Sequence, residues 1–214
     1  MKIAIMNLFI RIKKALGIFA HYYVTTGVEN VGKMGNGARI LIPADLKYPP
    51  NIFLDENVLI GRRSTIMTTG HGILRMGRNS GTAEGFTVIC STHDQAIGGQ
   101  IATNENNTYF TIEVEEDVWI GTNVTLLPGS HIGRGAILGA DATVRTKIPP
   151  YAIVIGNPAK VVGFKFTPEE VIEHEKALYS EEERLPLELL EKNYKKYFLD
   201  HIKEIKAYTG LICK

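Results

Sequence analysis

The sequence predicts an all-β fold, a parallel β-helix with a projecting loop, flanked by an N-terminal amphipathic helix and a C-terminal helical tail. Three observations support it: aliphatic residues recur at every sixth position in the second half of the chain, Gly, Asn and Asp stand between them, and helical patterns occur only at the two ends. The 214 residues, 44% hydrophobic and 22% charged, suit one globular domain and exclude a disordered or collagen-like chain.

The first twenty residues are apolar, but Arg11, Lys13 and Lys14 interrupt them, and no small-residue cleavage site follows. We therefore predict an amphipathic helix rather than a membrane span or a secretion signal. Two roles remain open. The helix packs against the fold or a neighbouring subunit, or residues 1–20 make weak contact with a membrane surface. The formal net charge of +1 gives no reason to expect nucleic acid as a partner.

The six-residue repeat is clearest between residues 112 and 163. A period of six is a multiple of the strand period of two and not of the helix period of 3.6, so each hexad is predicted to be a short strand followed by a sharp corner. The inward column is Val114, Ile120, Leu126, Ile132, Leu138 and Val144. Residues that tolerate unusual backbone angles stand at the predicted corners: Asp117, Asn123, Gly129, Gly135 and Asp141.

An earlier block repeats the spacing in Leu54, Ile60 and Ile66, after which the phase breaks before Met76 and Val88. The β-helix is therefore expected to begin near residue 50. This gives three parts: an N-terminal helix and lead-in over 1–50, the β-helix over 51–163 with a polar, Gly/Asn-rich loop over 94–111, and a helical extension over 164–214. Thr167, Pro168 and Glu170 predict a capping box that opens one helix, and residues 185–208 predict a second, both expected to cover the end of the coil.

Four segments resemble the hexapeptide-repeat acyltransferases: VWIGTNVTLLPG at 118–129, IGRGAILGADATV at 132–144, IPPYAIVIGNPAKVV at 148–162 and STHD at 91–94. The resemblance covers roughly residues 50 to 170 and is to the galactoside, maltose and xenobiotic acetyltransferase branch, while FTPEE at 166–170 is similar to sugar O-acetyltransferases of polysaccharide biosynthesis. It implies a left-handed coil, which the spacing does not show because crossovers between parallel strands are usually right-handed. It also implies acetyl-CoA as co-substrate and a homotrimer with active sites between subunits.

Acyl transfer from a thioester to a hydroxyl requires a general base, donors for the developing oxyanion and a slot that aligns both substrates. Alternation turns Val88, Cys90 and Thr92 inward, so His93 is predicted to point outward at a corner. Family members carry their catalytic histidine just ahead of a projecting loop, and His93 matches that position. Asp94 either orients the imidazole or only opens the loop.

Two neighbours of this position have alternative roles. His71 is the second candidate for the base and is otherwise expected to serve the fold or the acceptor pocket. Cys90 invites a Cys–His nucleophile, but its inward position predicts a buried, inert thiol, which favours direct attack by the acceptor. Cys90 and Cys213 are too far apart in the sequence to suggest a cysteine-based zinc site, and no metal is expected.

The resemblance also implies a coenzyme A site. Trp119, the single tryptophan, takes the same hexad position as His93 and is predicted to be exposed, lining the acceptor and cofactor cleft or packing on a neighbouring subunit. Thr122 and Ala140 match positions along which the pantetheine arm lies. Basic residues near the end of the coil are candidates for the phosphates or simply a solvated surface: Arg134, Arg145, Lys147, Lys160 and Lys165. The family often has Thr-Lys at the positions of Arg145 and Thr146 in this chain. It also often has a basic residue at the position of Gly163.

The expected function is a cytoplasmic acetyl-CoA-dependent O-acetyltransferase, in one alternative peripheral to the inner face of the membrane. Its acceptor would be a saccharide hydroxyl on a polysaccharide or on a nucleotide- or lipid-linked sugar, with His93 as general base. The alternatives are N-acetylation of an amino sugar and a non-catalytic or zinc-dependent hexapeptide protein.

Overall fold

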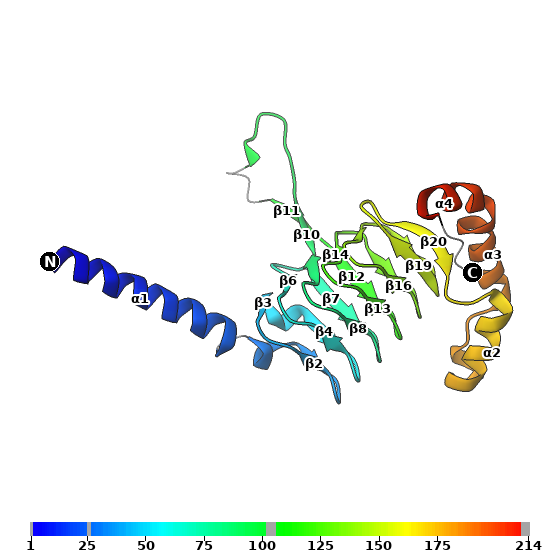
Figure 1. Cartoon of the computed structure of the whole chain (residues 1–214), viewed down its shortest axis with the longest axis horizontal. Helices are drawn as coiled ribbons and strands as arrows, with labels where there is room; N and C mark the ends of the chain where they lie inside the picture. The colour runs from blue at the N-terminus through cyan, green and yellow to red at the C-terminus, as the bar shows by residue number, and fades with distance from the viewer. Residues whose placement is uncertain (1, 25–26, 102–105, 211–214) are drawn as a thin grey trace.

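The structure, a computed structural model, describes residues 2–24, 27–101 and 106–210. A triangular coil of short strands forms the body, α1 (Lys2–Tyr23) extends from one end, and α2 (Pro168–Leu178), α3 (Leu187–Tyr197) and α4 (Ile202–Thr209) gather at the other (Figure 1). Short 3-10 turns connect these elements, among them Val28–Asn30, Pro49–Asn51, Glu181–Glu183 and Leu199–His201. The predicted parallel β-helix is confirmed, with about six turns.

Each of the first five turns of the coil contributes one strand to each of three sheets, and the last turn adds strands to sheets A and B. Sheet A contains β1 (Lys33–Met34), β4 (Ile52–Leu54), β7 (Ile73–Met76), β12 (Thr111–Val114), β15 (His131–Ile132) and β18 (Lys147–Ile148). Sheet B contains β2 (Arg39–Ile40), β5 (Leu59–Ile60), β8 (Gly81–Thr82), β13 (Trp119–Ile120), β16 (Ile137–Leu138), β19 (Ala152–Ile155) and β20 (Lys160–Phe164). Sheet C contains β3 (Ala44–Lys47), β6 (Ser64–Met67), β9 (Thr87–Ile89), β14 (Thr125–Leu126) and β17 (Thr143–Val144). Pairing within these sheets is parallel except between β19 and β20.

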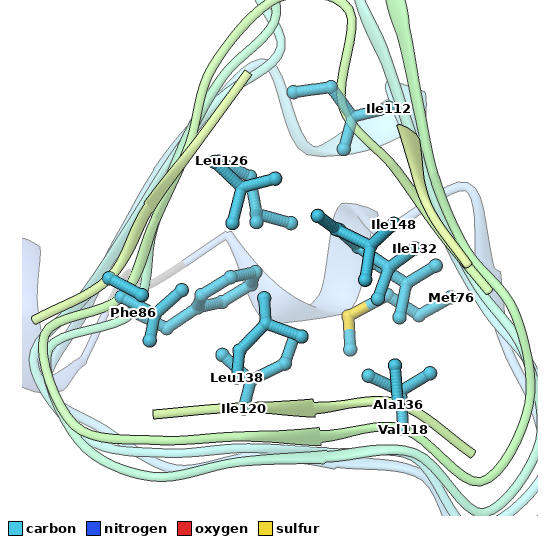
Figure 2. Close-up of a cluster of buried hydrophobic side chains, with 14 of the residues drawn as sticks. Met76, Phe86, Ile112, Val118, Ile120, Leu126, Ile132, Ala136, Leu138 and Ile148 are labelled. Carbon is cyan, nitrogen blue, oxygen red and sulfur yellow. The ribbon is translucent and has the colours of Figure 1, made fainter. Parts of the chain in front are cut away.

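The aliphatic column fills the interior of the coil. Ile120 and Leu138 of sheet B and Leu126 of sheet C are completely buried and point into the interior from two sides of the triangle (Figure 2). The predicted companion positions, such as Val118 and Ala136, are buried beside them. A single hexad could not bury its apolar side chain, so the stacking of successive coils is what creates this core.

The predicted corners adopt the backbone angles expected of them. Asp117, Asn123 and Asp141 have φ values of 56°, 58° and 60°, and Gly129 and Gly135 have φ values of 93° and 68°. In this left-handed region a side chain is usually strained, and Gly, Asn and Asp adopt it at the lowest cost. At Gly135 an added Cβ would also lie 2.5 Å from the ring of Tyr151, so both conformation and space require glycine there.

The coil begins earlier than residue 50, which corrects the expected boundary. Strands β1, β2 and β3 already pair in register with β4, β5 and β6, as in Ile40 opposite Ile60 and Leu46 opposite Ile66. The pattern was hard to recognise because Pro43, Pro49 and Pro50 interrupt this turn and because the spacing changes before Ile52.

The apparent break in phase before Val88 also has a local cause. Met76, Thr82 and Val88 are six residues apart, so the repeat continues with a polar residue in the aliphatic position. Thr82 is buried, and its hydroxyl accepts a hydrogen bond of 2.9 Å from the amide of Gly61. This bond compensates for desolvation of the hydroxyl, so a threonine is tolerated inside the coil.

The C-terminal extension covers the last coil. The predicted capping box is present, since Glu170 N donates to Thr167 Oγ1 and Thr167 N donates to Glu170 Oε2. The single helix predicted over 185–208 is instead α3 and α4, separated at the buried Phe198. The bend lets Tyr194 pack on Phe164 of the coil, with ring centroids 5.3 Å apart, while Ile205 of α4 is also buried. Residues 211–214, including Cys213, lie outside the described residues.

Candidate active site

His93 lies on the stem of a hairpin that leaves the coil at the corner between sheets C and A. The hairpin is formed by β10 (Ser91–His93) and β11 (Asn107–Tyr109), which pair antiparallel, and it projects away from the body (Figure 1). His93 is exposed, as predicted. Thr92 is exposed too, which corrects the inward position expected for it, because the chain departs from the coil directly after Cys90.

The register of the hairpin separates His93 from Asp94. His93 stands opposite Asn107, whereas Asp94 follows on the alternate face, and its Oδ1 accepts a hydrogen bond of 2.7 Å from Thr108 Oγ1. Adjacent residues of an extended strand point to opposite faces. The carboxylate of Asp94 therefore braces the hairpin through Thr108, and Asn107 is the side chain that shares the face of His93. No local sequence pattern pointed to Asn107. Residues 102–105 of the predicted loop lie outside the described residues.

His71 lies at the foot of the same hairpin. Its ring meets the ring of Tyr109 edge to face, with centroids 5.6 Å apart. The turn that carries it is held by Asn51, whose side-chain amide donates to the carbonyls of Gly70 and Gly72 at 3.0 and 2.8 Å. Both candidate histidines thus belong to one corner of the coil, and Asn51 and Tyr109 are supporting residues that sequence reasoning missed.

Cys90 is sealed in the core beneath the hairpin. Cys90 is fully buried, and its Sγ donates to the carbonyl of Ile73 at 3.3 Å. Burial raises the pKa of its thiol to about 12. Only a thiolate is a strong nucleophile, and desolvation disfavours that form. The buried position predicted from parity is confirmed.

Trp119 is exposed on the outer surface of sheet B. It is 50% exposed and stands in register between Gly81 and Ile137. A Cβ at Gly81 would lie 3.3 Å from Trp119 Cζ3, so the indole lies over the glycine of the neighbouring coil. Large exposed aromatic surface is costly in water and is typical of a ligand or subunit contact.

The hairpin and Trp119 belong to different sides of the coil. In cross-section, the corner near Ile112, from which the hairpin departs, lies opposite the side formed by the strand of Ile120, next to Trp119 (Figure 2). One chain therefore does not bring His93 and Trp119 together. A site that uses both residues needs a second copy of the chain.

Thr122 and Ala140 stack at the corner between sheets B and C. Both are exposed, and the amide of Asp141 donates to the carbonyl of Thr122 at 2.8 Å, which places the two corners one coil apart. The ridge they form carries no bulky side chain at either position.

The basic residues expected near the coil end do not form one cluster. Arg134 is tied to Glu116 and Glu175, at 2.7 and 3.1 Å. Lys165 lies beyond the far end of β20 from Lys160, with its Nζ 3.4 Å from Asp117 Oδ2. These cations are neutralised by partners more than fifteen residues away in sequence, which composition could not show.

Lys147 and Lys160 do share a cavity, of about 340 Å³, between the last coil and the C-terminal helices. Thr146 lines it beside Lys147, and α3, α4 and the turn between them add Tyr197, His201 and Tyr208. The ammonium of Lys160 lies 5.5 Å from the ring centre of Tyr208. Arg145 is exposed at the adjoining corner. The aromatic wall of this cavity was not predicted, because it depends on how the bent tail docks.

Among residues 2–24, 27–101 and 106–210, no three His, Cys, Asp or Glu side chains are grouped so that they could hold a metal ion. Within the same residues, no helix is both long and apolar enough to cross a bilayer.

The family model for bacterial transferase hexapeptides (six repeats) matches residues 111–146, the stretch from β12 to β17. Together with the three-sided coil and its aliphatic column, this match identifies residues 111–146 as bacterial transferase hexapeptide repeats.

Two curated relatives share parts of this hexapeptide-repeat chain. A chloramphenicol acetyltransferase of Klebsiella aerogenes is 47% identical over 58 residues, 27% of this chain and 28% of the relative. A protein of Staphylococcus aureus (strain COL) named as an acetyltransferase is 31% identical over 127 residues, 58% of this chain and 60% of the relative. The chain thus spans less than two thirds of the length of either relative.

Solved structures share the hexapeptide-repeat fold at lower identity. A hexapeptide-repeat acetyltransferase of Vibrio cholerae in complex with acetyl-coenzyme A gives a TM-score of 0.61 at 18% identity, covering 71% of this chain and 84% of that one. A galactoside acetyltransferase in complex with coenzyme A gives a TM-score of 0.57 at 22% identity, and the match covers 83% of this chain and 87% of that one. A D94A mutant of the N-acyltransferase AntD of Bacillus cereus, in complex with dTDP and coenzyme A, gives a TM-score of 0.53 at 16% identity. That match covers 72% of this chain and 96% of AntD. At these identities the likeness is one of fold.

Proposed function

We propose that this hexapeptide-repeat protein is an acetyl-CoA-dependent O-acetyltransferase that acts on a hydroxyl of a saccharide. The observation that carries the proposal is the position of His93: an exposed imidazole on the stem of a hairpin that projects from a hexapeptide coil. An exposed histidine next to a loop can meet a substrate, and the imidazole is the side chain that most often serves as a general base.

In the proposed reaction, His93 accepts the proton of the acceptor hydroxyl as its oxygen attacks the thioester carbonyl carbon. The new C–O bond forms, negative charge develops on the carbonyl oxygen, and the C–S bond then breaks. The proton held by His93 goes to the departing thiolate, so acetyl ester and free thiol are the products. No acyl-enzyme is needed, which agrees with the burial of Cys90. Asn107 and Asp94 are proposed to hold the hairpin and, through it, the imidazole.

The proposed donor site lies along the ridge of Thr122 and Ala140, whose peptide groups can bond the amides of the pantetheine arm. The cavity of Lys147 and Lys160 suits the nucleotide end, because it combines two ammonium groups with aromatic side chains. Arg145 at the adjoining corner is the third proposed phosphate contact. Lys165 is a weaker candidate than these three, since it is ion-paired with Asp117.

We further propose a homotrimer with three active sites, each between two subunits. The support is the separation of His93 and Trp119 onto different sides of one coil, which leaves a site that needs both incomplete in a single chain. The exposed indole would then be covered by donor or by the neighbouring subunit.

The saccharide acceptor follows from the O-acetyltransferase branch that the motifs resemble, and the proposed setting is polysaccharide biosynthesis in the cytoplasm, where acetyl-CoA is available. The similarity to a chloramphenicol acetyltransferase makes a small-molecule hydroxyl a second acceptor to test. The N-acyltransferase among the fold neighbours keeps N-acetylation of an amino sugar as the alternative.

Release of free thiol from acetyl-CoA tests the acceptor class. The assay compares neutral saccharides, amino sugars and chloramphenicol, with the acetylated product identified by mass spectrometry and by its lability to mild base. An alkali-labile acetyl ester on a sugar is the expected product. Transfer only to an amine would replace the O-acetyl proposal, and dependence of turnover on added zinc after chelation would favour the metal-dependent alternative.

A further inference from the structure

Helix α1 carries an unpartnered apolar face. Six side chains between 48% and 68% exposed lie along one side of it, at helical spacing: Leu8, Phe9, Ile12, Leu16, Phe19 and Tyr23. The helix extends away from the coil, so the body does not cover this face (Figure 1). An apolar stripe of this length is costly in water and points to a partner.

The charge of α1 indicates the chemistry of that partner. By helical spacing, Arg11 and Lys13 flank the stripe and Lys14 lies opposite it, and no Asp or Glu occurs in the chain before Glu29. The formal charge of the whole chain is only +1, so the rest of it has an excess of acidic residues. The positive charge is therefore concentrated on the element that also exposes the apolar stripe.

The attachment of α1 involves only the C-terminal end of the apolar stripe. His21 Nε2 lies 3.5 Å from Asp45 Oδ1 of β3, and Ile18, Tyr22 and Tyr23 line a cavity with Pro43 and Ala44 of the coil, so the stripe from Leu8 to Phe19 does not line this cavity. His21 lies seven residues after Lys14, on the same side of the helix, so the helix meets the coil partly through its polar side.

We propose that α1 lies in the surface of an anionic lipid bilayer, with its apolar stripe among the acyl chains and its cations among the headgroups. A basic amphipathic helix without acidic residues has the composition for this position. The bilayer is favoured over α1 of a second copy because only an anionic surface supplies charge opposite to Arg11, Lys13 and Lys14; a second α1 carries the same cations and no Asp or Glu. This inference does not depend on the proposed acetyl transfer.

Sedimentation of the full-length protein with vesicles tests the proposal. The protein is expected to bind phosphatidylcholine vesicles that contain phosphatidylglycerol, to bind pure phosphatidylcholine at least ten-fold more weakly, and to dissociate as salt is raised. Replacing Arg11, Lys13 and Lys14 together by Gln should weaken binding about 100-fold, and Leu16→Gln with Phe19→Gln should weaken it at least as much. The matched control replaces three exposed lysines of the C-terminal helices, Lys192, Lys195 and Lys203, by Gln and should bind as the parent does.

Three binding results would each overturn the proposal: no binding to anionic vesicles, equal binding to neutral ones, or an equal loss in the lysine control. The oligomeric state of the Leu16→Gln, Phe19→Gln variant provides the independent check. A smaller assembly in the absence of lipid would mean that a second copy covers the stripe, and an unchanged assembly supports the bilayer. Thiol release measured without lipid should be the same for all variants, which separates this inference from the proposed enzyme activity.

Discussion

The guanidinium of Arg134 lies 3.1 Å from the carboxylate of Glu175, although the first residue belongs to the coil and the second to α2. Glu175 is fully buried, and its oxygens also accept hydrogen bonds from Tyr151 Oη at 2.9 Å and from the amide of Leu185 at 2.6 Å. This fully bonded carboxylate fixes the C-terminal helices on the last coil, where they form the aromatic wall of the proposed nucleotide cavity.

Loss of this carboxylate should destabilise the protein. Glu175→Ala leaves Arg134 without a buried partner and is expected to lower the free energy of unfolding by about 3–5 kcal/mol. Urea denaturation followed by circular dichroism measures it. Lys176→Gln is the control, because it removes only an exposed ion pair with Glu173 and should change stability by less than about 0.5 kcal/mol. Equal effects of the two substitutions would remove Glu175 from the docking of the tail.

Cys90 should be inert in the native protein. Burial raises the pKa of its thiol to about 12, so the reactive thiolate is scarce at neutral pH. In a Cys213→Ser background, labelling by a disulfide reagent is expected to be slow until urea unfolds the chain, and Cys90→Ala should retain turnover. Rapid labelling of the folded protein that also abolishes acetyl transfer would restore the covalent mechanism.

Stability should fall in alkali. Burial, then the charge of Glu116, raises the pKa of Tyr179 to about 12, while burial and the hydrogen bond to Glu175 raise the pKa of Tyr151 further. A tyrosine in the unfolded chain ionises near about pH 10. The native state therefore keeps protons that the unfolded state loses, and the stabilisation, complete below about pH 10, is lost as pH rises toward the native pKa values.

Urea denaturation at a series of pH values between about 8 and 11 measures this loss. Tyr179→Phe is expected to flatten the decline, whereas Tyr48→Phe, at an exposed tyrosine, should leave it as it is. A free energy of unfolding that rises over this range would contradict the assignment.

His93 and Trp119 should complement each other between chains. His93→Ala and Trp119→Ala are each expected to be nearly inactive, while oligomers reassembled from equal amounts of both should recover about a quarter of the parental sites, because random mixing restores one intact pair in four. Thiol release after mixing measures the recovery. Mixtures no more active than the variants alone would show that both residues serve one chain's site, or that one of them is dispensable.

Much of the coil could be predicted because its signal is local and repeated. The column from Val114 to Val144 gave the period, and Asp117 and Asn123 marked the corners through their backbone preferences. The first turn was missed where prolines interrupt the pattern, and Thr82 concealed the repeat because a buried hydroxyl had found a partner in Gly61.

The site was less accessible to sequence reasoning. The alternation of inward and outward residues along a strand predicted that His93 is exposed. It did not predict the antiparallel register that puts Asn107 beside His93 and Asp94 on the other face. The pairing of Arg134 with Glu175 joins residues 41 positions apart, which no local pattern encodes. For the same reason, the division of the basic residues between ion pairs and the cavity could not be foreseen.

The most direct test of the account is the turnover of His93→Ala in the thiol-release assay with acetyl-CoA and the preferred saccharide. Loss of the general base is expected to lower kcat by about 10²- to 10⁴-fold, while His21→Ala, on α1, stays near the parental rate. Near-parental turnover of His93→Ala would contradict the proposed mechanism.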